Sequence, residues 1–300
     1  MLSRKIVTLS LILLLPMPAQ AELDIFACEP EWAALAVEIG QDHVTTYSAT
    51  TALQDPHYIQ ARPSLIAKVR NADIVICSGA QLEIGWLPVL LQKANNRSVM
   101  PGSSGYFEAS SFVERRDATA NVDRVQGDIH PLGNPHVQTD PHNITLIAAV
   151  LARRMAELDT ANAQAYQIGL DDFSVRWDEA IINWEAKSAP LKGKRIITHH
   201  KSWVYLERWL ELVEVANLEA IPGLPPAAGH LSGLVSRFEN QGADFIVRSP
   251  YQSARASNWL SERTGISALE LPLTVGGTDE ATDLFSLFDH IIDRLLEASQ

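Results

Sequence analysis

The chain has 300 residues, of which 46% are hydrophobic, and its formal net charge at pH 7 is −12. Nucleic-acid binding depends on clustered Lys and Arg, so this acidic balance argues against a nucleic-acid partner and suits a protein that attracts cations. The apolar fraction is sufficient for one large domain or two of ordinary size.

Residues 1–21 have the order of a cleavable secretory signal peptide. A short positive region precedes an apolar stretch over residues 6–17, and Ala19 and Ala21 are the small residues that a signal peptidase reads. The apolar stretch is too short to span a bilayer, which needs about 20 residues. No cysteine stands at the cleavage point, which argues against a lipoprotein anchor. We therefore predict export to the periplasm and a mature chain that begins at Glu22.

The first part of the mature chain alternates between strand-like and helix-like segments. The predicted strands cover residues 24–28, 43–48 and 73–77, and the predicted helices cover residues 31–40, 63–72 and 83–93. This rhythm with apolar strands is typical of a parallel sheet that is covered by helices on both faces.

The middle of the chain changes from loop to long helices. Residues 101–135 are rich in Gly, Ser, Asn, Asp and Pro and are predicted to be mainly loop. Helices are predicted over residues 144–158 and 161–187, because apolar residues recur there mostly at three- and four-residue steps. Gly169 leaves open whether the second helix is continuous. At 1.5 Å per residue that helix would reach about 40 Å, enough for a rigid strut.

The alternation of strand-like and helix-like segments returns after residue 194. The predicted strands cover residues 195–198, 214–220, 245–248 and 268–273, and the predicted helices cover residues 202–212, 230–241, 256–265 and 282–299. We therefore predict an α/β fold of two lobes, each a parallel sheet flanked by helices, joined by a long rigid helix. The N-terminal lobe would cover residues 22–157, the linking helix residues 158–187, and the C-terminal lobe residues 188–300.

The two cysteines leave two states open. Cys28 and Cys77 end strands that would be neighbours in such a sheet, and the periplasm is oxidising. A disulfide is therefore possible, although a direct bridge between adjacent strands is geometrically awkward.

Four metal-capable side chains lie in loops where ligands of parallel sheets usually bind, beyond the carboxyl ends of the strands. His57 and His136 lie in loops of the first half of the chain, His200 follows the strand 195–198, and Asp279 follows the last predicted strand. Three neutral imidazoles and one carboxylate suit zinc, which takes nitrogen and oxygen donors in a tetrahedral shell.

These residues stand in motifs that resemble the metal-binding proteins of zinc and manganese ABC importers, the cluster A-I family of solute-binding proteins. The motifs, in chain order, are Asp55-Pro56-His57, Asn134-Pro135-His136, His200-Lys201-Ser202-Trp203 and Val275-Gly276-Gly277-Thr278-Asp279. The resemblance implies a monomer that is not an enzyme, binds its metal between the lobes and delivers it to an inner-membrane ABC permease with a cytoplasmic ATPase. It leaves a periplasmic zinc chaperone open as the donor.

The same resemblance favours zinc as the transported ion. In this family the zinc members carry His at the third ligand position, where the manganese members tend to carry Glu, and this chain has His200 there. Manganese also prefers more oxygen ligands. Zinc members often carry a loop crowded with His before the second ligand, whereas residues 107–135 contain only His130, so we do not expect that loop to collect metal.

Several alternatives stay open. His199 could be the ligand in place of His200, but adjacent side chains leaving a strand point in opposite directions, so only one is expected to face the metal. Asp283 competes with Asp279 as the fourth ligand and could equally cap the last helix. A zinc hydrolase would use a similar site, although the chain has no HExxH motif. An adhesin with a structural metal and a manganese-binding member of the family are further alternatives.

Overall fold

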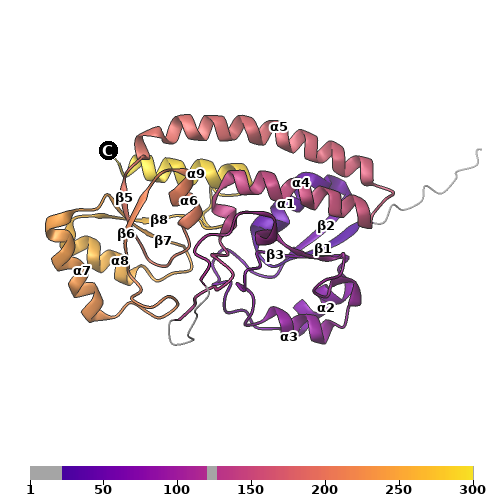
Figure 1. The fold of residues 1–300 in the computed structure, drawn as a ribbon, viewed down its shortest axis with the longest axis horizontal. Helices are drawn as coiled ribbons and strands as arrows, with labels where there is room; N and C mark the ends of the chain where they lie inside the picture. Colours follow the sequence, from indigo (N-terminus) through magenta and orange to yellow (C-terminus); the bar gives the residue numbers. More distant parts are fainter. Residues whose placement is uncertain (1–21, 120–126, 300) are drawn as a thin grey trace, which may run out of the picture.

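Two α/β lobes lie beneath one long helix (Figure 1). The computed structural model describes residues 22–119 and 127–299, so the predicted signal peptide at residues 1–21 lies outside the described residues. Each lobe contains one four-stranded sheet with parallel pairing throughout. The predicted fold class is confirmed.

The sheet of the first lobe has the strand order β2-β1-β3-β4. Its strands are β1 (Leu23–Ala27), β2 (Val44–Ser48), β3 (Ile74–Cys77) and β4 (Tyr106–Glu108), and its helices are α1 (Pro30–Gly40), α2 (Pro63–Asn71), α3 (Leu87–Ala94) and α4 (Pro141–Leu158). Successive residues of β1 and β3 point to opposite faces of the sheet. Ile25 and Ile76 pack with α1 and α4, while Phe26 and Val75 pack with α2 and α3. Burial on both faces explains the continuous apolar runs in the sequence.

The second lobe repeats this plan with the order β6-β5-β7-β8. Its strands are β5 (Arg195–Thr198), β6 (Val213–Asn217), β7 (Phe245–Arg248) and β8 (Ser267–Glu270), and its helices are α6 (Val204–Trp209), α7 (Ala228–Gln241), α8 (Ala254–Thr264) and α9 (Leu284–Glu297). Ile196 packs with α6 and α9, whereas its neighbour Ile197 packs with α7 and α8. Short 3₁₀ turns of the described chain lie at Gln41–His43, Arg97–Val99, Ala109–Phe112, Val137–Thr139 and Ala189–Leu191.

The long helix α5 (Ala163–Ser188) is continuous over its 26 residues. It packs on α1 and α4 of the first lobe and on α9 of the second. A Cβ atom at Gly169 would lie 2.0 Å from the carbonyl oxygen of Ile39, so glycine is needed there to let α5 approach α1. Among the described helices, none is long and apolar enough to cross a membrane.

An aromatic cluster fixes α5 to the rest of the molecule. Trp177 is fully buried at its centre, and its indole N–H donates a hydrogen bond of 3.0 Å to the carbonyl of Pro141 at the start of α4. The rings that pack on it belong to Phe173, Trp184, Phe285 and Phe288. Side chains from α5 and α9 thus share one core with the first lobe.

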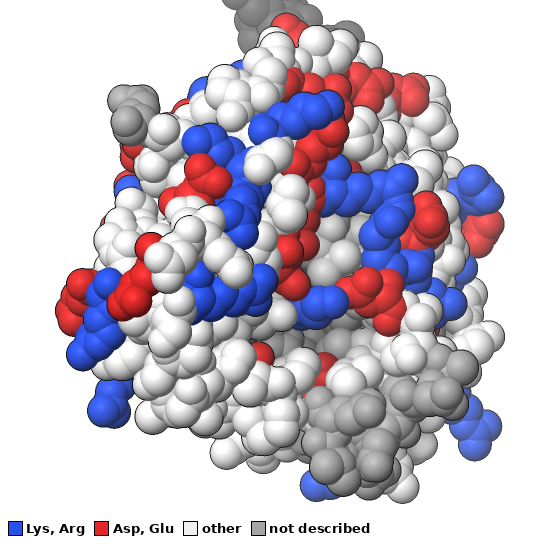
Figure 2. Space-filling model, turned by 60° about the vertical axis from the view of Figure 1, so that its left-hand side comes forward, with Lys and Arg blue, Asp and Glu red and all other residues white. Residues whose placement is uncertain are grey.

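Charges of both signs are interspersed on the face that the second lobe presents. Figure 2 shows Lys and Arg next to Asp and Glu over its upper part, while much of its lower part is uncharged.

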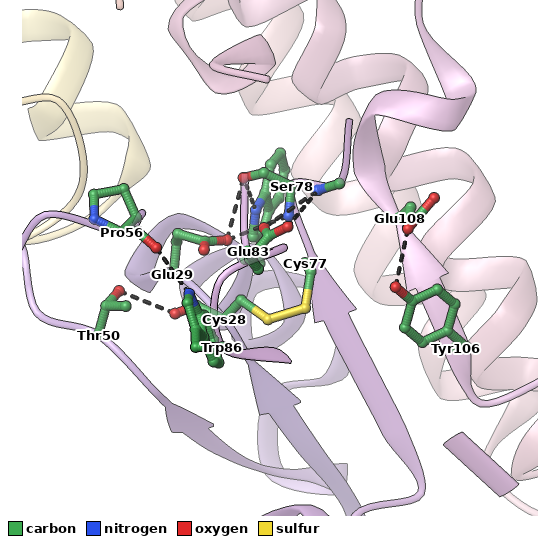
Figure 3. Close-up of a disulfide and its surroundings, with 12 residues drawn as sticks. Cys28, Glu29, Thr50, Pro56, Cys77, Ser78, Glu83, Trp86, Tyr106 and Glu108 are labelled. Carbon is green, nitrogen blue, oxygen red and sulfur yellow. Dashed lines mark hydrogen bonds between the residues drawn. A yellow bond between two sulfur atoms is a disulfide. The ribbon is translucent and has the colours of Figure 1, made fainter. Parts of the chain in front are cut away.

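The two cysteines are joined. A disulfide links Cys28 and Cys77, whose Cα atoms lie 4.8 Å apart, just beyond the carboxyl end of β1 and at the end of β3 (Figure 3). The structure thus selects one of the two states that the sequence left open.

Buried carboxyl groups lie next to this disulfide (Figure 3). The carboxylate of Glu29 accepts hydrogen bonds from the backbone N–H and the hydroxyl of Ser78, and Glu83 accepts one from the backbone N–H of Gly79. Burial raises the pKa of Glu83 to about 7, and burial together with the neighbouring Glu83 and Glu31 raises the pKa of Glu29 well above its ordinary value. At a pH between the ordinary pKa and the raised pKa, each of these carboxyl groups is protonated in the folded protein and ionised in the unfolded chain.

The stability of the variant Glu83→Gln, compared with that of wild type at the same pH, is expected to be higher at pH 8 than at pH 5. A pKa that is higher in the folded state adds stability at low pH, and this contribution is lost as the pH rises from about 4.5 through about 7. Gln keeps the shape and needs no proton. Urea unfolding of both proteins at the two pH values measures the change, on the order of 1 kcal/mol for each unit of pKa shift. The exposed Glu239→Gln is the control, and an equal effect of Glu83→Gln at both pH values would contradict the assignment.

Candidate metal centre

Three buried histidines meet where the two lobes face each other. His57, His136 and His200 each offer a ring nitrogen, and these atoms all lie within 4.8 Å of one another. These residues are 8%, 1% and 7% exposed, respectively. The structure thus brings together the three histidines that the sequence predicted as ligands, two from the first lobe and one from the second.

His57 is held by its own loop, which joins β2 to α2. Its Nδ1 atom lies 2.7 Å from Oδ1 of Asp55, and the indole N–H of Trp86 donates a hydrogen bond to the carbonyl of Pro56 (Figure 3). Burial alone would raise the pKa of Asp55, but the hydrogen bonds from His57 lower it below its ordinary value. A carboxylate on Nδ1 fixes the ring and leaves Nε2 free to bind a metal, as is usual for metal-binding histidines.

His200 has the same arrangement in the second lobe. It follows β5, and its Nδ1 atom lies 2.7 Å from Oε2 of Glu219, a residue just beyond the neighbouring strand β6. Glu219 also accepts a hydrogen bond of 2.7 Å from the backbone N–H of Gly223. The ring is thereby oriented with Nε2 available.

His136 has no such partner. Both of its ring nitrogens are buried and have no hydrogen-bond partner among the described residues. Burial lowers the pKa of His136 well below its ordinary value, so the ring is neutral. The loop before it is tied to the second lobe, because Asn134 donates to the carbonyl of Lys201 at 2.7 Å and accepts at its own carbonyl from Tyr205 at 2.8 Å.

This donor set fits zinc. Zinc binds neutral imidazole nitrogen at about 2.0–2.1 Å in a tetrahedral shell. Carboxylates orient the rings of His57 and His200. The ring nitrogens of His136 have no hydrogen-bond partner among the described residues, so its lone pair is available for a metal ion. A buried polar atom without a partner costs free energy in the folded state, and a bound metal ion would remove that cost at His136.

The structure does not bring the predicted fourth ligand to this group. Asp279 is exposed, and no described cluster of closely spaced ligand atoms contains it. Its rival Asp283 is also exposed and is the N-cap of α9, where its Oδ1 atom accepts from the backbone N–H of Ser286 at 2.7 Å. The capping alternative for Asp283 is therefore confirmed.

Asp283→Ala is expected to destabilise the protein by about 1 kcal/mol and to leave metal affinity unchanged. The cause is the loss of a helix cap, whose removal costs about 0.5–2 kcal/mol. Urea unfolding without metal measures the first effect and a zinc titration measures the second. Asp283→Asn, which keeps an accepting oxygen, should recover most of the stability. A fall in zinc affinity without a fall in stability would contradict the capping role.

The expectation that His199 points away from His200 is wrong. The two side chains approach the same carboxylate, since Nε2 of His199 lies 3.7 Å from Oε1 of Glu219. The alternation rule applies to extended strand, whereas β5 ends at Thr198 and the chain bends at the two histidines. Only His200 joins the cluster with His57 and His136.

Sequence reasoning missed two groups at this centre. Glu219 orients His200, but the sequence placed it inside the predicted strand 214–220, whereas β6 ends at Asn217 and leaves Glu219 in the loop beyond it. His130 lies with its Nε2 atom 3.2 Å from Nε2 of His57, although the sequence showed it only as a single histidine in a loop. Burial, followed by repulsion from His57 and His200, lowers the pKa of His130 to about 4, so this ring is neutral as well.

A cavity of about 660 Å³ opens beside the histidines. Its lining includes His57 and His200, the carboxylate of Glu219, and apolar side chains of α7 and α8 such as Leu231 and Trp259. A path from solvent therefore leads to the cluster between the lobes.

Comparison with known proteins identifies one family over nearly the whole described chain, and two curated relatives that cover 62–63% of the chain. The family model described as "Zinc-uptake complex component A periplasmic" matches residues 25–298. The chain is 23% identical over 195 residues to the metal ABC transporter substrate-binding lipoprotein ScbA of Streptococcus cristatus, covering 63% of this chain and 59% of the relative. It is 23% identical over 194 residues to the manganese ABC transporter substrate-binding lipoprotein PsaA of Streptococcus anginosus, covering 62% and 59%.

Solved structures share the fold. A crystal structure of ZnuA superposes with a TM-score of 0.77 at 20% identity, covering 93% of this chain and 100% of that chain. The match to the two curated relatives spans only 59% of their length, so it does not carry over their whole activity.

Proposed function

Because the chain belongs to the family of the periplasmic component A of zinc-uptake complexes, we propose that it captures Zn²⁺ in the periplasm and delivers it to an inner-membrane ABC permease with its cytoplasmic ATPase. The ion is the transported cargo. Membership in that family identifies a binding component of an uptake complex rather than an enzyme, which excludes the hydrolase alternative.

The metal would be held between the lobes. His57 and His136 belong to the N-terminal lobe, residues 22–157, and His200 to the C-terminal lobe, residues 188–300. The observation that carries the proposal is the state of His136, whose two ring nitrogens are buried without a partner among the described residues, beside two further oriented imidazoles. A metal ion is the ligand that three imidazoles with ring nitrogens within 4.8 Å of one another can share.

Zinc is favoured over manganese by the donor atoms. The cluster consists of imidazole nitrogens, which suit zinc, whereas manganese prefers carboxylate, carbonyl and water oxygens. The adjacent carboxylates of Asp55 and Glu219 are already engaged with Nδ1 atoms of the histidines. Manganese is the alternative, since PsaA relatives are named for it.

Release of the ion would depend on the loops rather than on the lobes as rigid bodies. The linking helix, residues 158–187, includes most of α5, which packs on α1, α4 and α9. This packing restricts a hinge motion between the lobes. The histidines lie in loops, so a local movement of these loops on docking to the permease would open the shell.

Metal analysis of the purified protein tests the proposal. We expect wild-type protein, stripped with a chelator and then offered zinc and manganese together, to keep stoichiometric zinc through gel filtration. Preferential retention of manganese would replace zinc in the proposal. Retention of neither metal would contradict metal capture.

A further inference from the structure

His130 lies directly against the candidate metal centre. Its Nε2 atom is 3.2 Å from Nε2 of His57, and the two ring centroids are 5.3 Å apart. The same small cavity is lined by His130, His136 and His200. We propose that His130 is the fourth nitrogen donor of the zinc shell, in the place that the sequence motifs give to Asp279. This inference rests on the proposed capture of zinc by the other three histidines.

The distance between the two Nε2 atoms suits a shared ion. In a tetrahedral shell with Zn–N bonds of about 2.0–2.1 Å, two ligand nitrogens lie about 3.3–3.4 Å apart. The observed 3.2 Å is close to that edge length. The Nδ1 atom of His57 faces the carboxylate of Asp55, so in the neutral ring the proton sits on Nδ1 and Nε2 presents a lone pair. Zinc would bind this lone pair together with the lone pair on Nε2 of His130, whose neutral ring would carry its single proton on Nδ1.

Contacts to both lobes hold the segment that carries His130. The backbone N–H of Asp128 donates to the carbonyl of Pro222 in the second lobe at 2.9 Å, and its Oδ2 atom accepts from the hydroxyl of Tyr58 in the first lobe at 2.7 Å. The packing at this point is tight, because a Cβ atom on Gly223 would lie 2.1 Å from Oδ2 of Asp128. The segment thus spans the opening between the lobes and places His130 beside His57.

The position of Asp279 supports His130, rather than Asp279, as the fourth ligand. That carboxylate is exposed and lies outside the cluster. His130 is also not one of the three clustered histidines, but it is half-buried and its Nε2 atom lies 3.2 Å from Nε2 of His57. A nitrogen donor in the fourth place would give the shell four imidazoles and no hard oxygen, which increases the preference for zinc over manganese.

The experiment compares His130→Ala with Asp279→Ala in the full mature chain. Zinc affinity is measured by competition with a chelator, and the number of imidazoles on zinc is counted by X-ray absorption. His142→Ala is the matched control, because that histidine is exposed and pairs with Glu185 on the surface. We expect His130→Ala to weaken zinc binding at least about 10-fold, since loss even of a partner outside the shell typically costs 10–100-fold. In His130→Ala the number of imidazoles on zinc should fall from four to three. In Asp279→Ala both the zinc affinity and this number should equal those of wild type.

Other outcomes separate this inference from the proposed function. If His57→Ala removes zinc binding while His130→Ala leaves both affinity and imidazole count unchanged, the fourth donor is not His130 and only this inference fails. A fall in affinity on Asp279→Ala, together with an oxygen donor in the wild-type shell, would likewise overturn this inference alone. If wild type binds no zinc, or His57→Ala has no effect, the proposed function itself fails.

Discussion

His136→Ala is expected to lower zinc affinity by more than about 100-fold, because loss of a direct donor should exceed the 10–100-fold cost of losing a partner outside the metal shell. His136 provides one of the three ring nitrogens that lie within 4.8 Å of one another, so the variant removes one of these nitrogen donors. Competition with a fluorescent chelator measures the affinity, and the buried Trp203, next to the third ligand loop, gives a second signal.

The same variant should not weaken the metal-free protein. Both ring nitrogens of His136 are buried without a partner among the described residues, and such atoms cost free energy in the folded state. Their removal offsets the lost packing of the ring. The Tm of the metal-free variant is therefore expected to equal that of metal-free wild type or to be slightly higher. An equal loss of stability with and without zinc would assign His136 a structural role instead.

Neighbouring histidines provide the sharpest control for the ligand set. His200→Ala should weaken zinc binding as strongly as His136→Ala, because both join the same cluster. His199→Ala should have a smaller effect, exerted through the carboxylate of Glu219 that both residues approach. If His199→Ala removed zinc binding and His200→Ala did not, the third ligand would be misassigned.

Trp177→Ala is expected to destabilise the protein by about 3–5 kcal/mol, the usual cost of truncating a fully buried Trp or Phe. Trp177 is fully buried on α5, contacts four aromatic rings and donates to the carbonyl of Pro141. Its removal leaves a cavity between the first lobe, α5 and α9 and breaks the hydrogen bond to the carbonyl of Pro141. Urea unfolding of the metal-free protein measures the loss.

Two comparisons control this prediction. Ile182→Ala on the same helix removes a side chain that is 66% exposed, so we expect a change within about 0.5 kcal/mol. Zinc affinity of folded Trp177→Ala should equal that of wild type, because Trp177 contributes no atom to the histidine cluster. A stability change as small as that of Ile182→Ala would contradict the role of the aromatic cluster in holding α5 to both lobes.

The sequence by itself determined the architecture. Short apolar runs alternating with helical periods predicted parallel sheets, and β5 and β7 were placed to the residue. The spacing along residues 161–187 predicted the long helix, which the structure places at Ala163–Ser188. These features depend on local periodicity, which burial of one helix face or of both sheet faces imposes on the chain itself. Three histidines were identified because loops beyond the carboxyl ends of parallel strands meet at one edge.

The tertiary structure alone decided which side chains reach that edge. Asp279 and Asp283 lie four residues apart, and only the packing of α9 shows that the second is a cap and that the first faces solvent. His199 and His200 lie beyond the strand, where the chain bends and alternation no longer sets direction. His130 lies 73 positions from His57 along the chain, yet their rings lie side by side, because Asp128 is fixed by Tyr58 and by Pro222. Such positions depend on contacts between distant segments, and no local pattern in the sequence encodes them.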